Sequence, residues 1–149
     1  MNKLERASFL NGIIGKPWKG GARGPDAFDC WHCAQYVMQQ IFQEQLPNID
    51  VPEQPDWRWM IETFAKHNEN KNWVEQLQPL NGLLVARDGS LVLMARLTRP
   101  AHIGVLFRTE KKVLHCHNVA GVCFDDLVTL RANGWTRLRY YTRATSYAN

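Results

Sequence analysis

The sequence predicts an α+β domain, in which helices come first and an antiparallel sheet follows. Apolar residues recur at helical spacing in the first half of the chain, whereas from Leu83 onward they alternate with a period of two. A parallel α/β fold would instead alternate strands and helices along the chain. The 149 residues and the apolar content of 45% suit one ordinary core and argue against two full domains, so we expect residues 1–149 to form a single domain.

The first expected element is a helix over residues 3–14. Leu4 and Leu10 recur at helical spacing, and Gly15, with a proline two residues later, supplies a stop. The stretch that follows, GKPWKGGARGPDAF, is expected to be a glycine-rich loop, because glycine permits backbone conformations and close approaches that side chains forbid. It lacks the Gly-Lys-Ser/Thr ending of a phosphate-binding loop.

A second helix is expected to begin directly after Asp29, whose side chain can cap it. The apolar stripe of this helix, which puts its first cysteine in the first turn, comprises Cys30, Cys33, Ala34, Val37 and Ile41. Four prolines between Leu46 and Leu80 then bracket one amphipathic segment. We therefore expect residues 47–79 to form a helical insert beside the core.

Strand-like runs follow, separated by turn-like stretches. In chain order they are LLVARDGSLVLMA, HIGVLF, KVLHCHN, GVCFDDLVTL and WTRLRYYTR. Consecutive runs of this kind predict an antiparallel meander.

Three histidines are predicted to cluster on one face of a hairpin within this meander. Alternation in HIGVLF puts His102 and Gly104 on one face and the Ile-Val-Phe positions on the other. If the phenylalanine that ends HIGVLF pairs with the lysine that opens KVLHCHN, then Gly104 faces His115, and His102 faces His117.

Cys30 is the candidate nucleophile. In the first turn of a helix its sulfur lies near unpaired backbone N–H groups and the positive end of the helix dipole, which stabilise a thiolate. A thiolate that hydrolyses acyl groups also needs a proton carrier, and the carrier needs a third group to set its tautomer. The histidines of the hairpin offer residues for both roles. Cys33, one helical turn further on, is expected to pack in the core.

The segments GKPWKGGARGPDAFDCW, GSLVLMA, HIGVLF and VLHCHN, in this order and spacing, resemble the motifs of the NlpC/p60 superfamily of cell-wall cysteine peptidases, which are compact relatives of the papain fold. The resemblance covers most of the chain outside the insert. It implies Cys30 as nucleophile, His102 as base and His115 as the residue that orients the base. Strand register leaves His117 as a second candidate for the orienting role. The implied substrate is a peptidoglycan stem peptide, and no metal or organic cofactor is implied.

The residues around the nucleophile look most like the phage tail-associated branch of that superfamily, which implies phage tail proteins as partners. Trp18 stands where many members have a tyrosine that helps bind the reacting carbonyl, and its indole keeps one N–H donor. Trp18 and Asp29 are the candidate oxyanion-binding and substrate-binding residues. Ser90 replaces an aspartate of the family pattern, and His32-Cys33 replaces small residues.

Three other interpretations stay open. Cys30 and Cys33 have the spacing of a thioredoxin-like redox pair, although a glycine-rich loop rather than a buried strand precedes them. Together with His115 and His117 they are also suitable zinc ligands, although no second C-x-x-C pair accompanies them. A non-catalytic tail or scaffold protein with the same fold is the third interpretation. The presence of Cys30, His102 and His115 argues against it.

Composition and charge argue against a membrane-spanning protein and against a secreted one. No apolar run approaches the roughly 18–20 residues of a membrane span. The start, MNKLERASFLNG, lacks the apolar core of a secretory signal, so we expect synthesis in a bacterial cytoplasm, with assembly into a phage tail as the resemblance implies. The four cysteines are expected to be thiols. Much of the net charge of +4 comes from an arginine-rich end, which we expect to be a solvated strand rather than a surface for nucleic acid.

Overall fold

The computed structural model describes residues 1–52, 56–69, 73–79 and 84–143. Within these residues the helices are α1 (Lys3–Ile13), α2 (Cys30–Phe42), α3 (Trp57–Glu69) and α4 (Leu127–Ala132). The strands are β1 (Trp73–Gln76), β2 (Leu91–Arg96), β3 (Arg99–Phe107), β4 (Lys112–His117), β5 (Gly121–Asp126) and β6 (Arg137–Arg143). They form one antiparallel sheet in the order β1-β6-β2-β3-β4-β5. The expected α+β class is confirmed.

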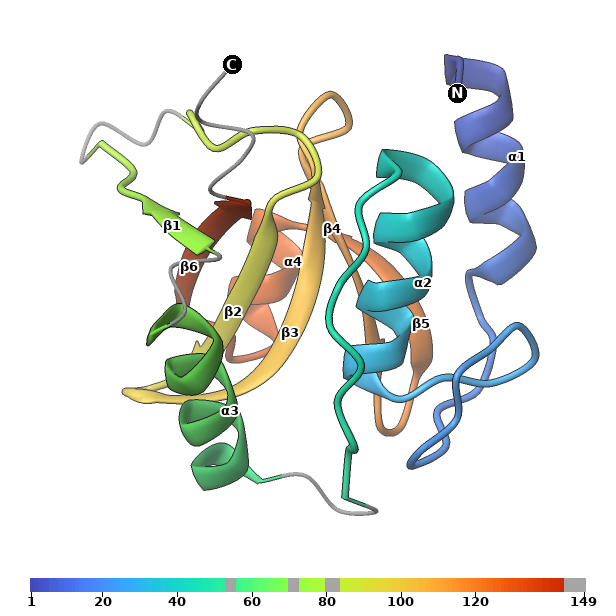
Figure 1. Cartoon of the computed structure of the whole chain (residues 1–149). Helices are drawn as coiled ribbons and strands as arrows, with labels where there is room; N and C mark the ends of the chain where they lie inside the picture. The colour runs from blue at the N-terminus through green and yellow to red at the C-terminus, as the bar shows by residue number, and fades with distance from the viewer. Residues whose placement is uncertain (53–55, 70–72, 80–83, 144–149) are drawn as a thin grey trace.

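Helices lie on both faces of this sheet (Figure 1). Helix α2 packs against β3 and β4, with α1 on its outer side, whereas α4 lies behind the sheet in this view. No helix of the described residues is both long enough and apolar enough to cross a bilayer.

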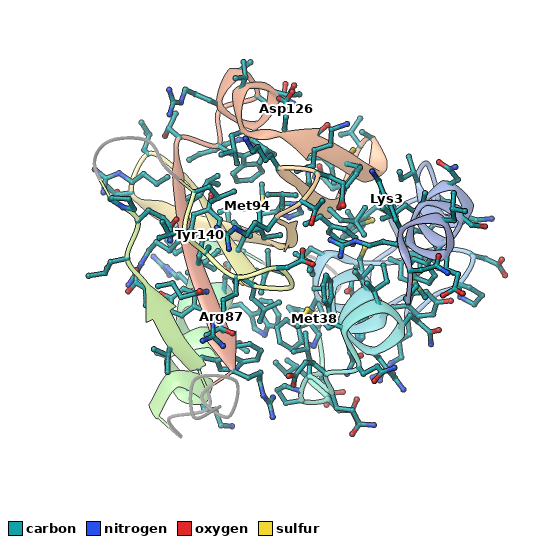
Figure 2. All side chains as sticks on the ribbon, turned by 90° about the horizontal axis from the view of Figure 1, so that it is seen from above. Lys3, Met38, Arg87, Met94, Asp126 and Tyr140 are labelled. Atoms are coloured by element: carbon teal, nitrogen blue, oxygen red, sulfur yellow. The ribbon has the colours of Figure 1, made fainter. Side chains whose placement is uncertain are left out.

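Two buried clusters occupy the two faces of the sheet. The larger cluster joins α1 and α2 to the face that carries Ile103, and it includes Met38 of α2. The smaller cluster joins the opposite face, with Met94 and Tyr140, to Leu130 of α4. In Figure 2, seen from above, Met38 lies on the side of α2, while Met94 and Tyr140 lie on the sheet. Both faces of the central strands are therefore covered.

The two N-terminal helices begin where the sequence predicts. Asn2 caps α1 by accepting a hydrogen bond from the Glu5 backbone N–H at 2.9 Å, and the Glu5 carboxylate accepts one from the Asn2 backbone in return. Asp29 caps α2, because its Oδ1 accepts a hydrogen bond from the His32 backbone N–H at 2.7 Å. This cap makes Cys30 the first residue of the helix, as expected.

The β3–β4 hairpin has the predicted register. Phe107 pairs with Lys112, and Gly104 pairs with His115. A side chain at Gly104 would not fit, because a Cβ there would lie 2.6 Å from a methyl carbon of Val113. This glycine therefore allows β4, with its histidines, to lie close against β3.

Three segments differ from the sequence prediction. Residues 47–79 are not wholly helical, because β1 lies within them and pairs with β6 at the edge of the sheet. The run GVCFDDLVTL is a strand only as far as Asp126, whose side chain accepts a hydrogen bond from the Thr129 N–H at 2.7 Å and so starts α4. The run LLVARDGSLVLMA, whose first residue lies outside the described residues, becomes a strand only at Leu91, after a turn in which Gly89 has φ +80°.

Candidate active site

Cys30 and His102 line the same cavity, which has a volume of about 500 Å³. Cys30 comes from the first turn of α2, and His102 comes from β3. Trp18 from the glycine-rich loop and His117 from the end of β4 line the same cavity. The fold therefore gathers at one place four of the residues that the sequence singles out.

His102 is hydrogen-bonded to His115, and His115 in turn to Asp125. The Nε2 atom of His102 lies 2.9 Å from Nδ1 of His115. The Nε2 atom of His115 lies 2.8 Å from Oδ2 of Asp125 on β5. Both histidines are buried, whereas the Asp125 side chain is 22% exposed. The result is a chain of three side chains from three adjacent strands.

This chain of hydrogen bonds assigns a tautomer to each ring. An ionised Asp125 only accepts hydrogen bonds, so Nε2 of His115 carries a proton. Burial lowers the pKa of His115, which keeps its ring neutral near pH 7 and leaves Nδ1 free to accept. The proton between the two rings then belongs to Nε2 of His102. The Nδ1 atom of His102 is left as the basic nitrogen.

The acid–base state of Cys30 differs from the sequence expectation. Burial, and secondly the Asp29 carboxylate, raises the pKa of the Cys30 thiol to about 12. The backbone N–H groups of Cys30, Trp31 and Ile103 act in the opposite direction but do not outweigh burial. Burial also lowers the pKa of His102 well below its usual value. The N–H groups at the helix start thus favour the thiolate as the sequence predicts, but burial outweighs them and favours the neutral forms of both the Cys30 thiol and the His102 imidazole.

Trp18 is held at the cavity by the backbone of its loop. The Lys19 N–H donates to the Phe28 carbonyl at 2.9 Å, and Phe28 N–H donates to the Pro17 carbonyl at 3.1 Å. The start of the loop is fixed to β5, because the Val122 N–H donates to the Lys16 carbonyl at 2.9 Å. The glycine-rich loop thus brings an indole N–H donor to the cavity that holds the thiol.

Asp29 does not line this cavity. Its carboxylate is fully buried and accepts hydrogen bonds from the backbone N–H groups of Gly21 and His32 at 3.1 and 2.7 Å. A further hydrogen bond, of 2.8 Å, joins it to Nδ1 of His32. These contacts tie the glycine-rich loop to the start of α2. Asp29 therefore supports the position of Cys30, and its carboxylate has no path to a substrate in the cavity.

His117 lies close to His102 but is not hydrogen-bonded to it. The ring centroids of these two residues are 6.5 Å apart, compared with 5.0 Å for His102 and His115. The Nδ1 atom of His117 accepts hydrogen bonds from the backbone N–H groups of Val119 and Ala120 at 3.1 and 3.3 Å. Of the two candidates for the orienting role, the geometry therefore favours His115.

Solved structures of NlpC/p60 proteins are among those similar to this chain. The NlpC/p60 domain of the peptidoglycan hydrolase SagA is 15% identical, with a TM-score of 0.54, and the match covers 94% of this chain and 98% of that domain. NlpC2 from Trichomonas vaginalis is 14% identical, with a TM-score of 0.52, over 93% of this chain and 44% of that protein. A Staphylococcus aureus protein of the NLP/P60 family, described as similar to lipoprotein, is 16% identical, with a TM-score of 0.53, over 93% of this chain and 42% of that protein.

The chain has the NlpC/p60 fold. It spans nearly all of the SagA domain but less than half of the Trichomonas vaginalis and Staphylococcus aureus proteins. No protein-family model and no curated protein sequence matches it. The papain-like architecture implied by the sequence motifs is thus confirmed at the level of the fold.

One departure from the NlpC/p60 motifs has a structural explanation. Ser90, at the position of a family aspartate, is buried, and its hydroxyl donates to the Arg87 carbonyl at 2.6 Å. The same hydroxyl accepts a hydrogen bond from the side chain of Gln76 on β1 at 2.8 Å. Ser90 therefore joins the edge strand to the turn before β2 and takes no part in the cavity.

Three residues of the site in this NlpC/p60 fold were not predicted from the sequence. Asp125 pairs with Val113 and so lies on the same sheet face as His115, a position that extending the predicted register to β5 would have revealed. The Trp135 ring stacks on His102, with centroids 5.1 Å apart and planes at 18°. Arg96 at the end of β2 lines the cavity beside them. Trp135 comes from the segment between α4 and β6, and it meets His102 and Arg96 only once the sheet has formed.

The open alternatives based on the cysteines are not favoured by this geometry. All four cysteines are free thiols, and Cys33 is buried in the core with only 1% exposed. The only potential metal-binding group found among the described residues is His115, Cys123 and Asp125, whose ligand atoms lie within 4.8 Å of one another. The quartet of Cys30, Cys33, His115 and His117 is therefore not gathered into a zinc site.

Proposed function

We propose that this protein is a cysteine peptidase that hydrolyses amide bonds in peptidoglycan stem peptides, with Cys30, His102 and His115 as its catalytic triad. The observation that carries the proposal is the shared cavity of Cys30 and His102, in which His102 is hydrogen-bonded to His115 through Nε2. That bond leaves Nδ1 of His102 as the base. The fold supports the same class of reaction, since the similar SagA domain belongs to a peptidoglycan hydrolase.

In this mechanism the thiol is deprotonated as it attacks. The Cys30 sulfur bonds to the substrate carbonyl carbon while Nδ1 of His102 takes the thiol proton. The Cys30 backbone N–H, at the start of α2, and the Trp18 indole N–H bind the resulting oxyanion. The imidazolium of His102 then donates its proton to the leaving amine as the C–N bond breaks. His102 next deprotonates the water that hydrolyses the thioester and returns that proton to the sulfur.

His115 and Asp125 support the charge that His102 acquires. Protonation of His102 places a positive charge in a buried site, where it is costly unless compensated. The Asp125 carboxylate holds His115 in the tautomer that accepts a hydrogen bond from His102, and its negative charge offsets the imidazolium charge. Asp125 acts through His115 and is therefore a positioning residue.

The test is hydrolysis of defined stem peptides, with products identified by mass spectrometry. We expect Cys30→Ser to leave the circular dichroism spectrum unchanged and abolish hydrolysis, because a serine hydroxyl is a far weaker acid than a thiol. Cys33→Ala is the matched control and should retain activity. Equal loss from both variants, together with dithiol-dependent disulfide reduction, would favour an oxidoreductase instead. A folded wild-type protein that hydrolyses none of the peptides would favour the non-catalytic scaffold.

The likeness of the residues around Cys30 to the phage tail-associated branch supports a narrower proposal. The protein would be made in a bacterial cytoplasm and assembled with phage tail proteins. Mass spectrometry of purified virions tests this directly. Detection of the protein in virions at a fixed ratio to a tail protein supports the proposal, and its presence only in the cell lysate contradicts it.

A further inference from the structure

Arg96 occupies the boundary between two adjoining cavities. It is the last residue of β2 and lines the cavity that contains Cys30 and His102. It also lines a second cavity, of about 280 Å³, that contains His115 and Asp125. Trp135 and His117 line both cavities as well, so the two cavities adjoin at these three side chains. A peptide bound in the cavity of Cys30 therefore has the Arg96 side chain in the wall of its binding site.

The guanidinium of Arg96 is positioned by the turn before β6. It lies over the Trp135 ring, with its central carbon 4.2 Å from the ring centroid. One of its nitrogens donates to the Asn133 carbonyl at 3.3 Å. The turn has a glycine at position 134 (φ +93°), and a Cβ there would lie 3.4 Å from Nε of Arg96. The Arg96 side chain is thus held in place by these contacts, although the residue is exposed to solvent.

The positive charge of Arg96 has no carboxylate partner among the residues that the structure describes. Asp125, the acidic residue that lines the second cavity, is hydrogen-bonded to His115. Other arginines of the chain have such partners: Arg6 pairs with Asp88, and Arg139 pairs with Glu75. The charge of Arg96 also reaches the proposed base, since it is among the causes that lower the pKa of His102, and it contributes to the lowered pKa of His117. A guanidinium that is held in place at a cavity and has no carboxylate partner in the described residues is suited to bind an anionic group of a ligand.

We propose that Arg96, supported by Trp135, binds a carboxylate of the substrate next to the scissile amide. The inference rests on the proposed function. It predicts that the protein binds peptides with a free carboxylate at this position more tightly than peptides in which that group is a carboxamide. The planar guanidinium matches a carboxylate with two parallel hydrogen bonds, whereas a carboxamide offers one acceptor and no charge. A bound carboxylate also offsets the effect of Arg96 on His102, which makes the imidazole a stronger base when the correct substrate is present.

Binding to a Cys30→Ala variant tests the inference without hydrolysis. Two synthetic stem peptides that differ only in one group, a carboxylate or a carboxamide beside the scissile amide, are titrated calorimetrically. We expect the carboxylate peptide to bind about tenfold more tightly, as for one charge-assisted interaction in a partly solvated site. Adding Arg96→Gln should remove this preference, and Arg96→Lys should restore part of it. Arg108→Gln is the matched control and should keep the preference, because Arg108 is an exposed arginine directly after the C-terminal end of β3.

The outcomes separate this inference from the proposed function. Equal binding of the two peptides, or a preference that survives Arg96→Gln, overturns the role of Arg96 even if the wild-type protein hydrolyses both peptides. Failure of both peptides to bind overturns it too. Carboxylate-dependent binding that Arg96→Gln abolishes supports the subsite even if the wild-type protein releases no product, and in that case it is the peptidase proposal that fails.

Discussion

Replacing Asp125 with alanine tests whether the hydrogen-bonded chain of His102, His115 and Asp125 contributes to catalysis. The substitution removes the acceptor 2.8 Å from Nε2 of His115, after which His115 can adopt either tautomer. A charge-assisted hydrogen bond contributes about 1.5–3 kcal/mol, and the lower end applies here because the Asp125 side chain is 22% exposed. Since about 1.4 kcal/mol corresponds to a factor of ten in rate, we expect kcat to fall about tenfold. KM should change little, because Asp125 acts through His115.

The assay is steady-state hydrolysis of a stem peptide, with Asp126→Ala as the matched control. Asp126 is the neighbouring residue, and its side chain caps α4. Its replacement should lower the free energy of unfolding, because the cap of α4 is lost, and leave kcat unchanged. An unchanged kcat in a folded Asp125→Ala variant, or an equal fall in both variants, would refute the positioning role of Asp125.

Three further predictions follow from the same contacts. We expect His115→Ala to lower kcat more than His117→Ala, because only His115 is hydrogen-bonded to His102; the opposite order in folded variants would mean that His117 orients the base. Burial raises the pKa of Cys30 to about 12, so we expect alkylation of its thiol by iodoacetamide in the free protein to accelerate about tenfold per pH unit between pH 7 and pH 10. A rate that is independent of pH in this range would indicate a preformed thiolate. Chelators should neither unfold nor inactivate the protein, since a thiol with a histidine base needs no ion; collapse of the fold on chelation would instead indicate a structural metal. Excess Zn²⁺ should inhibit the protein by binding to His115, Cys123 and Asp125.

The parts of the fold that were predictable are those specified by local sequence. Asp29 followed by an apolar stripe indicated where α2 begins, and the cap is present in the structure. The alternation in HIGVLF and the turn after it gave the register that pairs Gly104 with His115. Since register determines which side chains share a face, the clustering of the histidines was also predictable.

The parts that were missed depend on contacts between segments far apart in the sequence. The strand β1 forms only because β6 offers it an open edge, and its four residues carry no distinctive alternation. Asp125 meets His115 only after β5 has paired with β4. The raised pKa of Cys30 could not be foreseen, because the helix start is visible in the sequence whereas the burial of the thiol is not. Such burial results from the packing of the loop, α2 and β3 together.

The most direct measurement is rapid quenching of the wild-type protein with a stem peptide, followed by mass spectrometry of the peptide that contains Cys30 and Cys33. We expect a transient acyl adduct on the Cys30 sulfur, which appears before the free acid product and is absent from the Cys30→Ser variant. Hydrolysis that proceeds equally well in the folded Cys30→Ser variant would contradict Cys30 as the nucleophile.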